Sequence, residues 1–211
     1  MKDDRLWDEY YVKNGVHAIN IEKVRDMLRK HDLTDPTLTI LDFGCGDGYF
    51  LKSMSDIFPM QFGCDISSKA VISAKSRNPS ATIRQNVREL PFRDNQFDIV
   101  FMIKSISAVA PAMLDLVFSE VKRILKRGGS ILIVDFKPNE RDALYPICGG
   151  MFRARSPEWS DEIFPLFTPE DFETILGFDL LDSEELTLTS YHGNEYPGIM
   201  ALLHDSTYEP Q

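Results

Sequence analysis

Residues 37–48 read TLTILDFGCGDG, and this stretch decides the fold. Its first part, Thr37 to Phe43, is short and rich in apolar and β-branched side chains, which is typical of a buried strand. Gly44 to Gly48 then breaks the strand with a glycine-rich loop, and Tyr49 to Phe58 reads as a helix. A strand, a glycine loop and a helix in this order predict the opening unit of an α/β sheet.

The same alternation continues on both sides of this unit. A helix is predicted from Asn20 to His31, with an asparagine cap and an apolar face. The other predicted strands are Gln61–Asp65, Ala81–Gln85, Phe97–Met102 and Ser130–Phe136, and the other predicted helices are Ser67–Ser76 and Pro111–Leu125, the second ended by Gly128 and Gly129. Strands that alternate with helices predict a doubly wound, mostly parallel sheet.

The pattern changes after Phe136. Residues 137–167 are too long for a simple connection, and we expect this insert to cap the functional site. Thr168 begins a further helix, and Phe178–Leu188 and Gly198–His204 are predicted to pair as an antiparallel hairpin. We therefore expect a single domain over residues 1–211, in which residues 1–31 form an N-terminal arm and helix that act as a lid.

Composition limits the function. The chain has 211 residues, 43% of them hydrophobic, which is enough for one core. Its 33 acidic and 23 basic side chains give a net charge of -10, which argues against a protein that binds nucleic acid by neutralising phosphates. Cys45, Cys64 and Cys148 have no C-x-x-C spacing, so we expect neither a disulfide framework nor a metal site. The charged N-terminus and the absence of a long apolar run predict a cytoplasmic protein without a membrane span.

The glycine loop does not fit a dinucleotide or a nucleoside triphosphate. Gly44 and Gly46 match the start of G-x-G-x-x-G, but the third glycine, Gly48, comes one residue early. Asp42 and Asp47 flank the loop and no lysine follows it, so a bound phosphate would meet negative charge. The loop therefore favours a ligand without phosphate that carries positive charge.

Four segments, in this order, resemble the motifs of the class I S-adenosylmethionine-dependent methyltransferases. They are ILDFGCGDG (Ile40–Gly48), GCDIS (Gly63–Ser67), NVRELPFRDNQFDIVF (Asn86–Phe101) and LKRGGSILIVDF (Leu125–Phe136). The LPF segment is similar to that of a subgroup many of whose members act on small molecules. The resemblance implies a Rossmann-like α/β fold with a mostly parallel seven-stranded sheet and one antiparallel strand. It also implies S-adenosylmethionine as the cofactor and S-adenosylhomocysteine as its product.

The chain departs from the family in three places. The loop IKSISAVAP (103–111) lacks the histidine that is common there, and Arg127 replaces a common proline. Asn86 and Val87 stand where an aspartate and a small residue often lie near the adenine, although an asparagine carbonyl can still accept a hydrogen bond. These departures do not change the expected binding of the cofactor, but they leave the identity of the substrate undetermined.

The resemblance assigns the cofactor to residues along these motifs. The glycine loop would approach its amino-acid tail, and Asp65 would accept hydrogen bonds from its ribose hydroxyls. The full set of expected cofactor-binding residues is Asp42, Gly44, Cys45, Gly46, Gly48, Asp65, Ile66, Asn86, Val87, Ile103, Lys104 and Tyr11.

Methyl transfer is an in-line displacement, so the protein acts mainly by positioning, and no dedicated base is required. His17, Asp135 and His192 are the candidates if the acceptor must lose a proton. We expect a small-molecule acceptor. The alternatives are methylation of a protein or RNA, and a non-catalytic protein that binds S-adenosylmethionine and serves as a scaffold.

Overall fold

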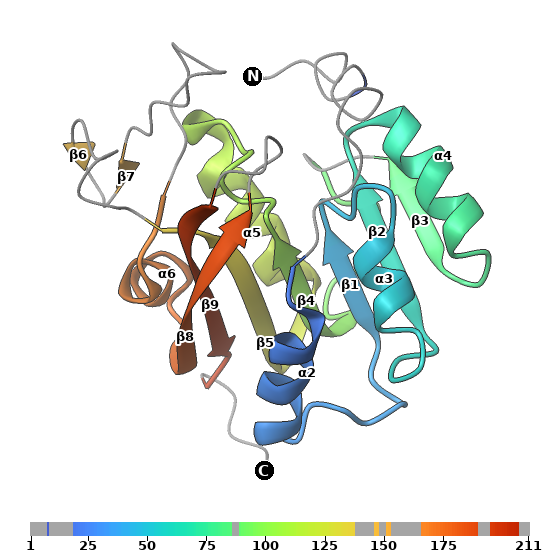
Figure 1. Ribbon diagram of the computed structural model, residues 1–211, viewed down its shortest axis with the longest axis horizontal. Helices are drawn as coiled ribbons and strands as arrows, with labels where there is room; N and C mark the ends of the chain where they lie inside the picture. The colour runs from blue at the N-terminus through green and yellow to red at the C-terminus, as the bar shows by residue number, and fades with distance from the viewer. Residues whose placement is uncertain are drawn as a thin grey trace.

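The computed structural model describes residue 8 and residues 19–85, 89–137, 146–147, 151–152, 166–189 and 195–206. These residues form a seven-stranded sheet in the order β3-β2-β1-β4-β5-β9-β8 (Figure 1). Its strands are β1 (Ile40–Phe43), β2 (Gln61–Asp65), β3 (Thr82–Gln85), β4 (Phe97–Ile103), β5 (Leu125–Phe136), β8 (Asp179–Thr189) and β9 (Glu195–His204). A separate antiparallel pair, β6 (Pro146–Ile147) and β7 (Met151–Phe152), lies within the predicted insert.

The directions of the strands match the predicted fold class. Strands β3, β2, β1, β4 and β5 are parallel neighbours, whereas β9 is antiparallel to both β5 and β8. Strand β9 is thus the one antiparallel strand of a mostly parallel sheet, and the predicted hairpin at the C-terminal end is confirmed. Because the strand order reverses between β1 and β4, the chain leaves these two strands towards opposite faces of the sheet, and open α/β sheets bind ligands at the carboxyl edge of such a point.

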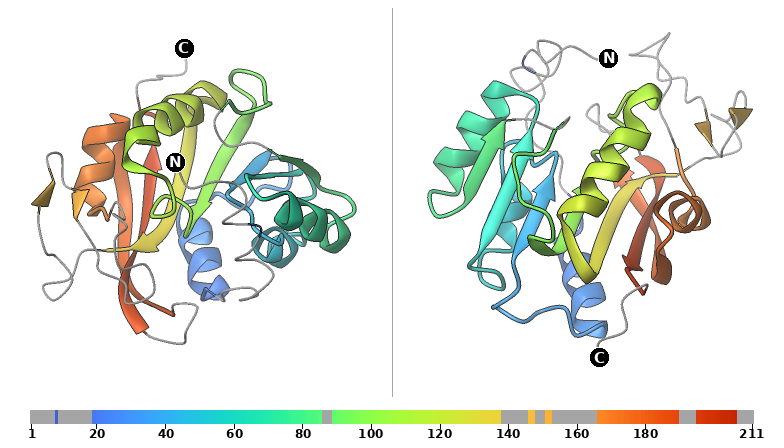
Figure 2. Two further views of the ribbon diagram at one scale, coloured as in Figure 1. Left: turned by 90° about the horizontal axis from the view of Figure 1, so that it is seen from above. Right: turned by 180° about the vertical axis from the view of Figure 1, so that it is seen from behind.

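Helices cover both faces of the sheet (Figure 2). On one face lie α5 (Leu114–Ile124) and α6 (Pro169–Leu176), and on the other lie α2 (Ile21–Lys30), α3 (Tyr49–Ser53) and α4 (Ser68–Arg77). Strand β4 shows why both layers are needed. Its alternate side chains Val100 and Met102 pack with the α5 layer, whereas Ile99 and Phe101 pack with the α2 layer, and all four are fully buried.

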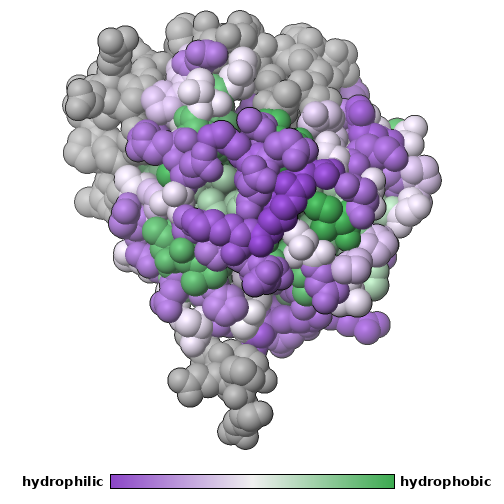
Figure 3. All heavy atoms as spheres, turned by 60° about the horizontal axis from the view of Figure 1, so that its bottom comes forward, coloured by the Kyte–Doolittle hydropathy of each residue, from purple (hydrophilic) through white to green (hydrophobic). Residues whose placement is uncertain are grey.

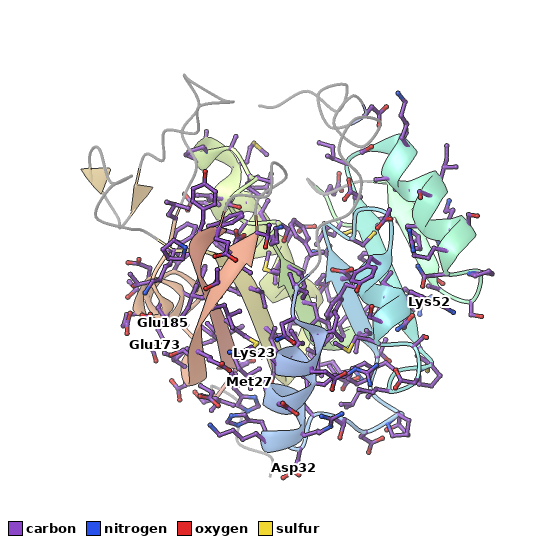
Figure 4. The ribbon with its side chains drawn as sticks, viewed as in Figure 1. Lys23, Met27, Asp32, Lys52, Glu173 and Glu185 are labelled. Atoms are coloured by element: carbon purple, nitrogen blue, oxygen red, sulfur yellow. The ribbon has the colours of Figure 1, made fainter. Side chains whose placement is uncertain are left out.

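Ion pairs connect helix α2 to strand β8 and to the turn before β2. Asn20 caps it, as predicted, by accepting a hydrogen bond from the amide of Lys23. Lys23 also pairs with Glu184 of β8, and Arg25 pairs with Asp56 in the turn before β2. Figure 4 shows Lys23 and Met27 on this helix, and Met27 is buried beneath it. The face of the molecule that carries α2 is mostly hydrophilic at its middle (Figure 3), as expected for its charged outer side.

One boundary was predicted wrongly for a clear reason. The helix expected over Pro111–Leu125 begins as a short 3-10 turn, η1 (Pro111–Met113), and continues as α5 only to Ile124. Gly128 and Gly129 do not end it, because they lie inside β5, which begins at Leu125. Leu125 is already extended, is 2% exposed and pairs with Phe97, so burial of its side chain favours strand over helix.

Two other predicted elements are shorter than expected. The first strand begins at Ile40, because Thr37 is engaged in a turn with the Asp35 carboxylate through its amide and its hydroxyl. Helix α3 ends at Ser53, and turns carry the chain to Phe58. Within the described part of the chain, no helix has both the length and the apolar character needed to cross a membrane.

Candidate functional site

Backbone hydrogen bonds attach the glycine loop after β1 to the neighbouring strand β2. Its glycines Gly44, Gly46 and Gly48 all have positive φ, between 54° and 77°, a region that side chains disfavour. The amides of Gly44 and Cys45 both donate to the carbonyl oxygen of Cys64 in β2, each at 2.9 Å. These bonds attach the start of the loop to the end of β2.

The helix after β2 supports the other end of this loop. The Nδ2 atom of Asn78, at the end of α4, donates to the carbonyl oxygen of Gly48 at 2.9 Å. A Cβ atom on Gly48 would lie 2.3 Å from that nitrogen, so only glycine fits. Asp47 forms an ion pair with Arg77 at 2.6 Å, and its negative charge is therefore already compensated by a residue of the protein. The sequence indicated that Asn78 ends a helix but did not indicate this contact.

Asp65 ends β2 and lies across the glycine loop. Its Oδ2 atom accepts from the amide of Gly46 and its Oδ1 atom accepts from the amide of Ser67, both at 2.9 Å. Burial raises the pKa of Asp65 to about 6, although these backbone amides and that of Ile66 oppose the shift. A carboxylate held in this way by backbone donors has a fixed orientation and keeps lone pairs available for a ligand.

Asp42, in β1, places a buried carboxylate at the site. It is 1% exposed, and neither of its carboxylate oxygens has a hydrogen-bond partner among the described residues. Burial, and then the negative charge of Asp65, raise the pKa of Asp42 well above its ordinary value. A buried carboxylate without partners is costly, and a ligand cation would remove that cost. The acidic site is therefore suited to the ammonium group and sulfonium of S-adenosylmethionine.

Ser105 adds a second unpartnered oxygen in the loop after β4. Its side chain is 7% exposed, and its hydroxyl has no partner within the described part of the chain. It packs directly against Gly44 of the first loop. Its place directly after Lys104, just beyond this strand, predicts from the sequence that it faces the methyl group or the methionine carboxylate of the cofactor, although it is not in the set of cofactor-binding residues given above.

Lys104 precedes Ser105 and has an unusual backbone. Its φ is +54°, and its amide donates to the carbonyl oxygen of Val134 at 2.6 Å. Its Nζ atom donates to the carbonyl oxygen of Thr189 at 3.1 Å and lies 5.5 Å from the centre of the Phe136 ring. Burial lowers the pKa of Lys104 to about 8, and the charge of Asp135 opposes this shift.

Asp135 orders the loop that carries these residues. It is 3% exposed, and its carboxylate accepts from the hydroxyl of Ser107 at 2.6 Å, the amide of Ser107 at 3.0 Å and the amide of Phe136 at 2.8 Å. Burial raises the pKa of Asp135. Both oxygens are thus committed to the connection between β4 and β5.

The structure brings most of the expected cofactor-binding residues together at one edge. Asp42, the glycine loop with the buried Cys45, Asp65 and Ile66 adjoin one another, and Ile103 ends β4 beside them. Five of the expected site residues lie outside the described residues: Tyr11, His17, Asn86, Val87 and His192. Asp98, at the start of β4, accepts from the amide of Thr39 and from Lys126 and therefore has a structural role.

Comparison with known proteins agrees with this site. Residues 41–133 match a family described as a methyltransferase domain. An uncharacterized methyltransferase of Synechocystis is 36% identical over 101 residues, which are 47% of this chain and 48% of that protein. The human protein named arginine-hydroxylase NDUFAF5, mitochondrial, is 27% identical over 205 residues, which cover 92% of this chain and 54% of that protein. Several other relatives are named tRNA methyltransferases. The chain spans about half or less of the length of these first relatives.

Solved structures resemble the whole fold. A SAM-dependent methyltransferase from Methanosarcina mazei superposes with a TM-score of 0.69 at 25% identity, covering 90% of this chain and 98% of that one. The matched family segment runs from the second residue of β1 into β5 and thus contains the glycine loop, Asp65 and Lys104. The family match and the solved structures support a class I S-adenosylmethionine-dependent methyltransferase.

Proposed function

We propose that this protein transfers a methyl group from S-adenosylmethionine to a small-molecule acceptor. The observation that carries the proposal is Asp42, a fully buried carboxylate whose two oxygens have no partner among the described residues, beside a glycine loop that has no phosphate-binding lysine. Among adenosine-containing ligands, one with a cationic tail satisfies Asp42, whereas a dinucleotide would add like charge.

The residues of the site divide between the two ends of the cofactor. Asp65 is suited to the ribose, because its two oxygens are already oriented by Gly46 and Ser67. Asp42 and Ser105 are suited to the amino-acid tail, because their side-chain oxygens are buried and unpartnered in the described structure. When bound, the cofactor supplies an activated methyl group on a sulfonium leaving group.

The protein's own contribution is to position the acceptor and exclude water. Holding two reacting groups at near-attack distance contributes on the order of 7 to 11 kcal/mol, so a nitrogen or thiolate acceptor needs no dedicated base. We assign Asp135 to ordering the loop after β4, because the hydrogen bonds of its carboxylate within the described part of the chain run to Ser107 and Phe136. His17 and His192 stay the candidate bases for an acceptor that must lose a proton.

The carboxyl edge beyond the cofactor residues suggests an acceptor with an aromatic ring and an anionic group. The rings of Phe136 and Tyr196 are both half-buried there and meet edge to face, 6.0 Å apart. The ammonium group of Lys104 lies over the Phe136 ring. Aromatic side chains contact a planar ring favourably, and the ammonium group would attract a carboxylate or phenolate.

A macromolecular acceptor is the second candidate. Relatives named as tRNA methyltransferases favour it. The relative named as an arginine hydroxylase also favours it, because its sequence aligns with 92% of this chain. The net charge of -10 opposes it, because an RNA-binding surface must neutralise phosphates. The two candidates differ in salt dependence, since RNA binding, which neutralises many phosphates, weakens steeply with salt, whereas binding of a small acceptor with one anionic group weakens much less.

Calorimetry and a turnover assay test the proposal. We expect S-adenosylmethionine and S-adenosylhomocysteine to bind with a stoichiometry of one, and NAD and ATP not to bind. S-adenosylhomocysteine should then form on addition of an aromatic acid, phenol or amine, but not on addition of tRNA or an arginine peptide. Absence of cofactor binding would refute the proposal. Cofactor binding without turnover on any acceptor would instead favour the non-catalytic scaffold.

A further inference from the structure

Asp8 makes a set of contacts far from its own position in the sequence. Its Oδ1 atom accepts from the hydroxyl of Ser67 at 2.5 Å and from the amide of Lys69 at 3.2 Å. Its Oδ2 atom accepts from the hydroxyl of Ser68 at 3.0 Å. One carboxylate from the N-terminal segment therefore holds three consecutive residues at the start of α4.

These three residues follow directly on the ribose-side carboxylate. Ser67 is the shared element, because its amide donates to Asp65 while its hydroxyl donates to Asp8. The same hydroxyl accepts from the amide of Ala70 and so caps α4. The orientation of the Ser67 backbone thus depends on Asp8 on one side and determines a hydrogen bond to Asp65 on the other.

We propose that Asp8 is a positioning residue for the cofactor, which acts by holding the connection between β2 and α4 in the conformation that orients Asp65. The inference rests on the proposed function, since it assumes that Asp65 binds the ribose. Asp8 need not touch the cofactor. Its effect is carried by the backbone of Ser67 and should therefore appear at the adenosine end of the ligand and not at the amino-acid tail.

A merely structural cap makes a different prediction. Replacement of Asp8 would then lower the stability of α4, and cofactor affinity would fall only as far as the folded protein is lost. The chain offers a matched control in Asp35, whose carboxylate accepts from the amide and the hydroxyl of Thr37 at 2.8 and 2.7 Å in an exposed turn before β1. Asp35→Ala removes the same kind of side chain and the same kind of contacts without touching the connection between β2 and α4.

The test measures ligand affinity by calorimetry for the full chain and for Asp8→Ala, Asp8→Glu and Asp35→Ala. The ligands are S-adenosylhomocysteine and 5′-methylthioadenosine, which share the adenosine and differ in the tail. Asp8→Ala should weaken both ligands by the same factor, about five- to tenfold, as expected for the loss of a capping interaction. Asp8→Glu should recover part of this loss, and Asp35→Ala should leave both affinities unchanged.

A double-mutant cycle identifies the contact. Ser68→Ala removes the partner of Oδ2 and leaves the Ser67 cap in place. It should weaken binding in the wild-type background and have no further effect in Asp8→Ala. Affinities of Asp8→Ala within twofold of wild type, or a loss confined to S-adenosylhomocysteine, would overturn the inference. Failure of the wild-type chain to bind either ligand would instead overturn the proposed function.

Discussion

Gly44 and Ser105 meet where the loops after β1 and β4 approach each other: a Cβ atom built on Gly44 would lie 2.6 Å from the Cβ atom of Ser105. These two loops diverge from neighbouring parallel strands, so this contact sets their separation at the carboxyl edge. It also brings Ser105, whose hydroxyl has no hydrogen-bond partner among the described residues, against the glycine loop.

Gly44→Ala tests that contact. The variant adds a methyl group both in a left-handed conformation and in a space that is already filled. We expect a loss of about 2 to 5 kcal/mol in the free energy of unfolding, from strain of roughly 1 to 2 kcal/mol and overpacking of roughly 1 to 3 kcal/mol. Gly177→Ala is the control, because Gly177 has φ +65° and no atom of the described residues lies within 4 Å of the added Cβ. Urea unfolding measures both, and equal losses would contradict the steric argument.

The parts of the fold that follow from local patterns were predictable. Strand β2 was predicted at its observed residues, and Ser67 and Thr168 cap their helices where the sequence places them. The glycine loop and Asp65 were also located from the sequence, because a turn, a strand end and an acidic residue can each be recognised from a few neighbouring residues.

The parts that depend on distant partners were not predictable. Gly128 reads as a helix end, but the pairing of Leu125 with Phe97 extends β5 past it. Lys104 adopts a positive φ that no local signal indicates, while its amide bonds Val134 in the next strand. Asp8 reads as one charge in a polar arm, and its role depends on serines that lie 59 and 60 residues away.

Replacement of Asp65 separates binding from folding. Asp65→Ala leaves the amides of Gly46 and Ser67 without acceptors and removes the oxygens assigned to the ribose. We expect about a hundredfold loss of S-adenosylhomocysteine affinity or more, since hydrogen bonds to charged groups are worth roughly 1.5 to 3 kcal/mol each. Asp98→Ala is the control, because Asp98 accepts from the Thr39 amide at the opposite end of β4. Calorimetry should show unchanged affinity there, and circular dichroism should show folded protein in both variants. Unchanged affinity in Asp65→Ala would remove the ribose assignment.

The affinity for the cofactor should depend on pH through the acidic pair. The pKa of Asp65 is raised to about 6, and that of Asp42 is also raised, so the two carboxyls titrate as a coupled pair. Their ionised forms accept ribose hydroxyls and attract the tail ammonium, so affinity should fall as the pH drops below about 6. In the free protein the sign is opposite, because a raised acid pKa favours the protonated folded form, and this contribution to stability decreases as the pH rises from 3.8 towards 6. Calorimetry across this range, with thermal unfolding of the free protein, checks both signs. An affinity independent of pH would contradict the assignment.

Helix α6 depends on the box at its N-terminus. Thr168 accepts from the amide of Asp171 at 3.3 Å, and the Asp171 carboxylate accepts from the amide of Thr168 at 2.8 Å. Phe172 and Leu176 of this helix are fully or almost fully buried against α5 and the sheet. Thr168→Ala should lower the free energy of unfolding by about 1 kcal/mol, the usual cost of a lost cap. Thr168→Ser keeps the hydroxyl and should lose much less in the same urea titration. Cofactor affinity should stay at the wild-type value, because the box lies outside the ribose and tail residues.

Lys104 tests the class of acceptor. Lys104→Met keeps much of the side-chain volume but removes the ammonium group beside Phe136. We expect kcat/KM to fall about tenfold or more for acceptors that carry a carboxylate or phenolate, and to change little for neutral acceptors. Wild-type activity on anionic acceptors should also fall above pH 8, because the pKa of Lys104 is lowered to about 8 and its charge is lost there. Lys122→Met is the matched control, since Lys122 donates to the Ile175 carbonyl oxygen at 3.3 Å and lies 5.9 Å from the Phe178 ring on the α5 face. Equal losses on anionic and neutral acceptors in Lys104→Met, or the same loss in Lys122→Met, would show that Lys104 supports packing and does not select the acceptor.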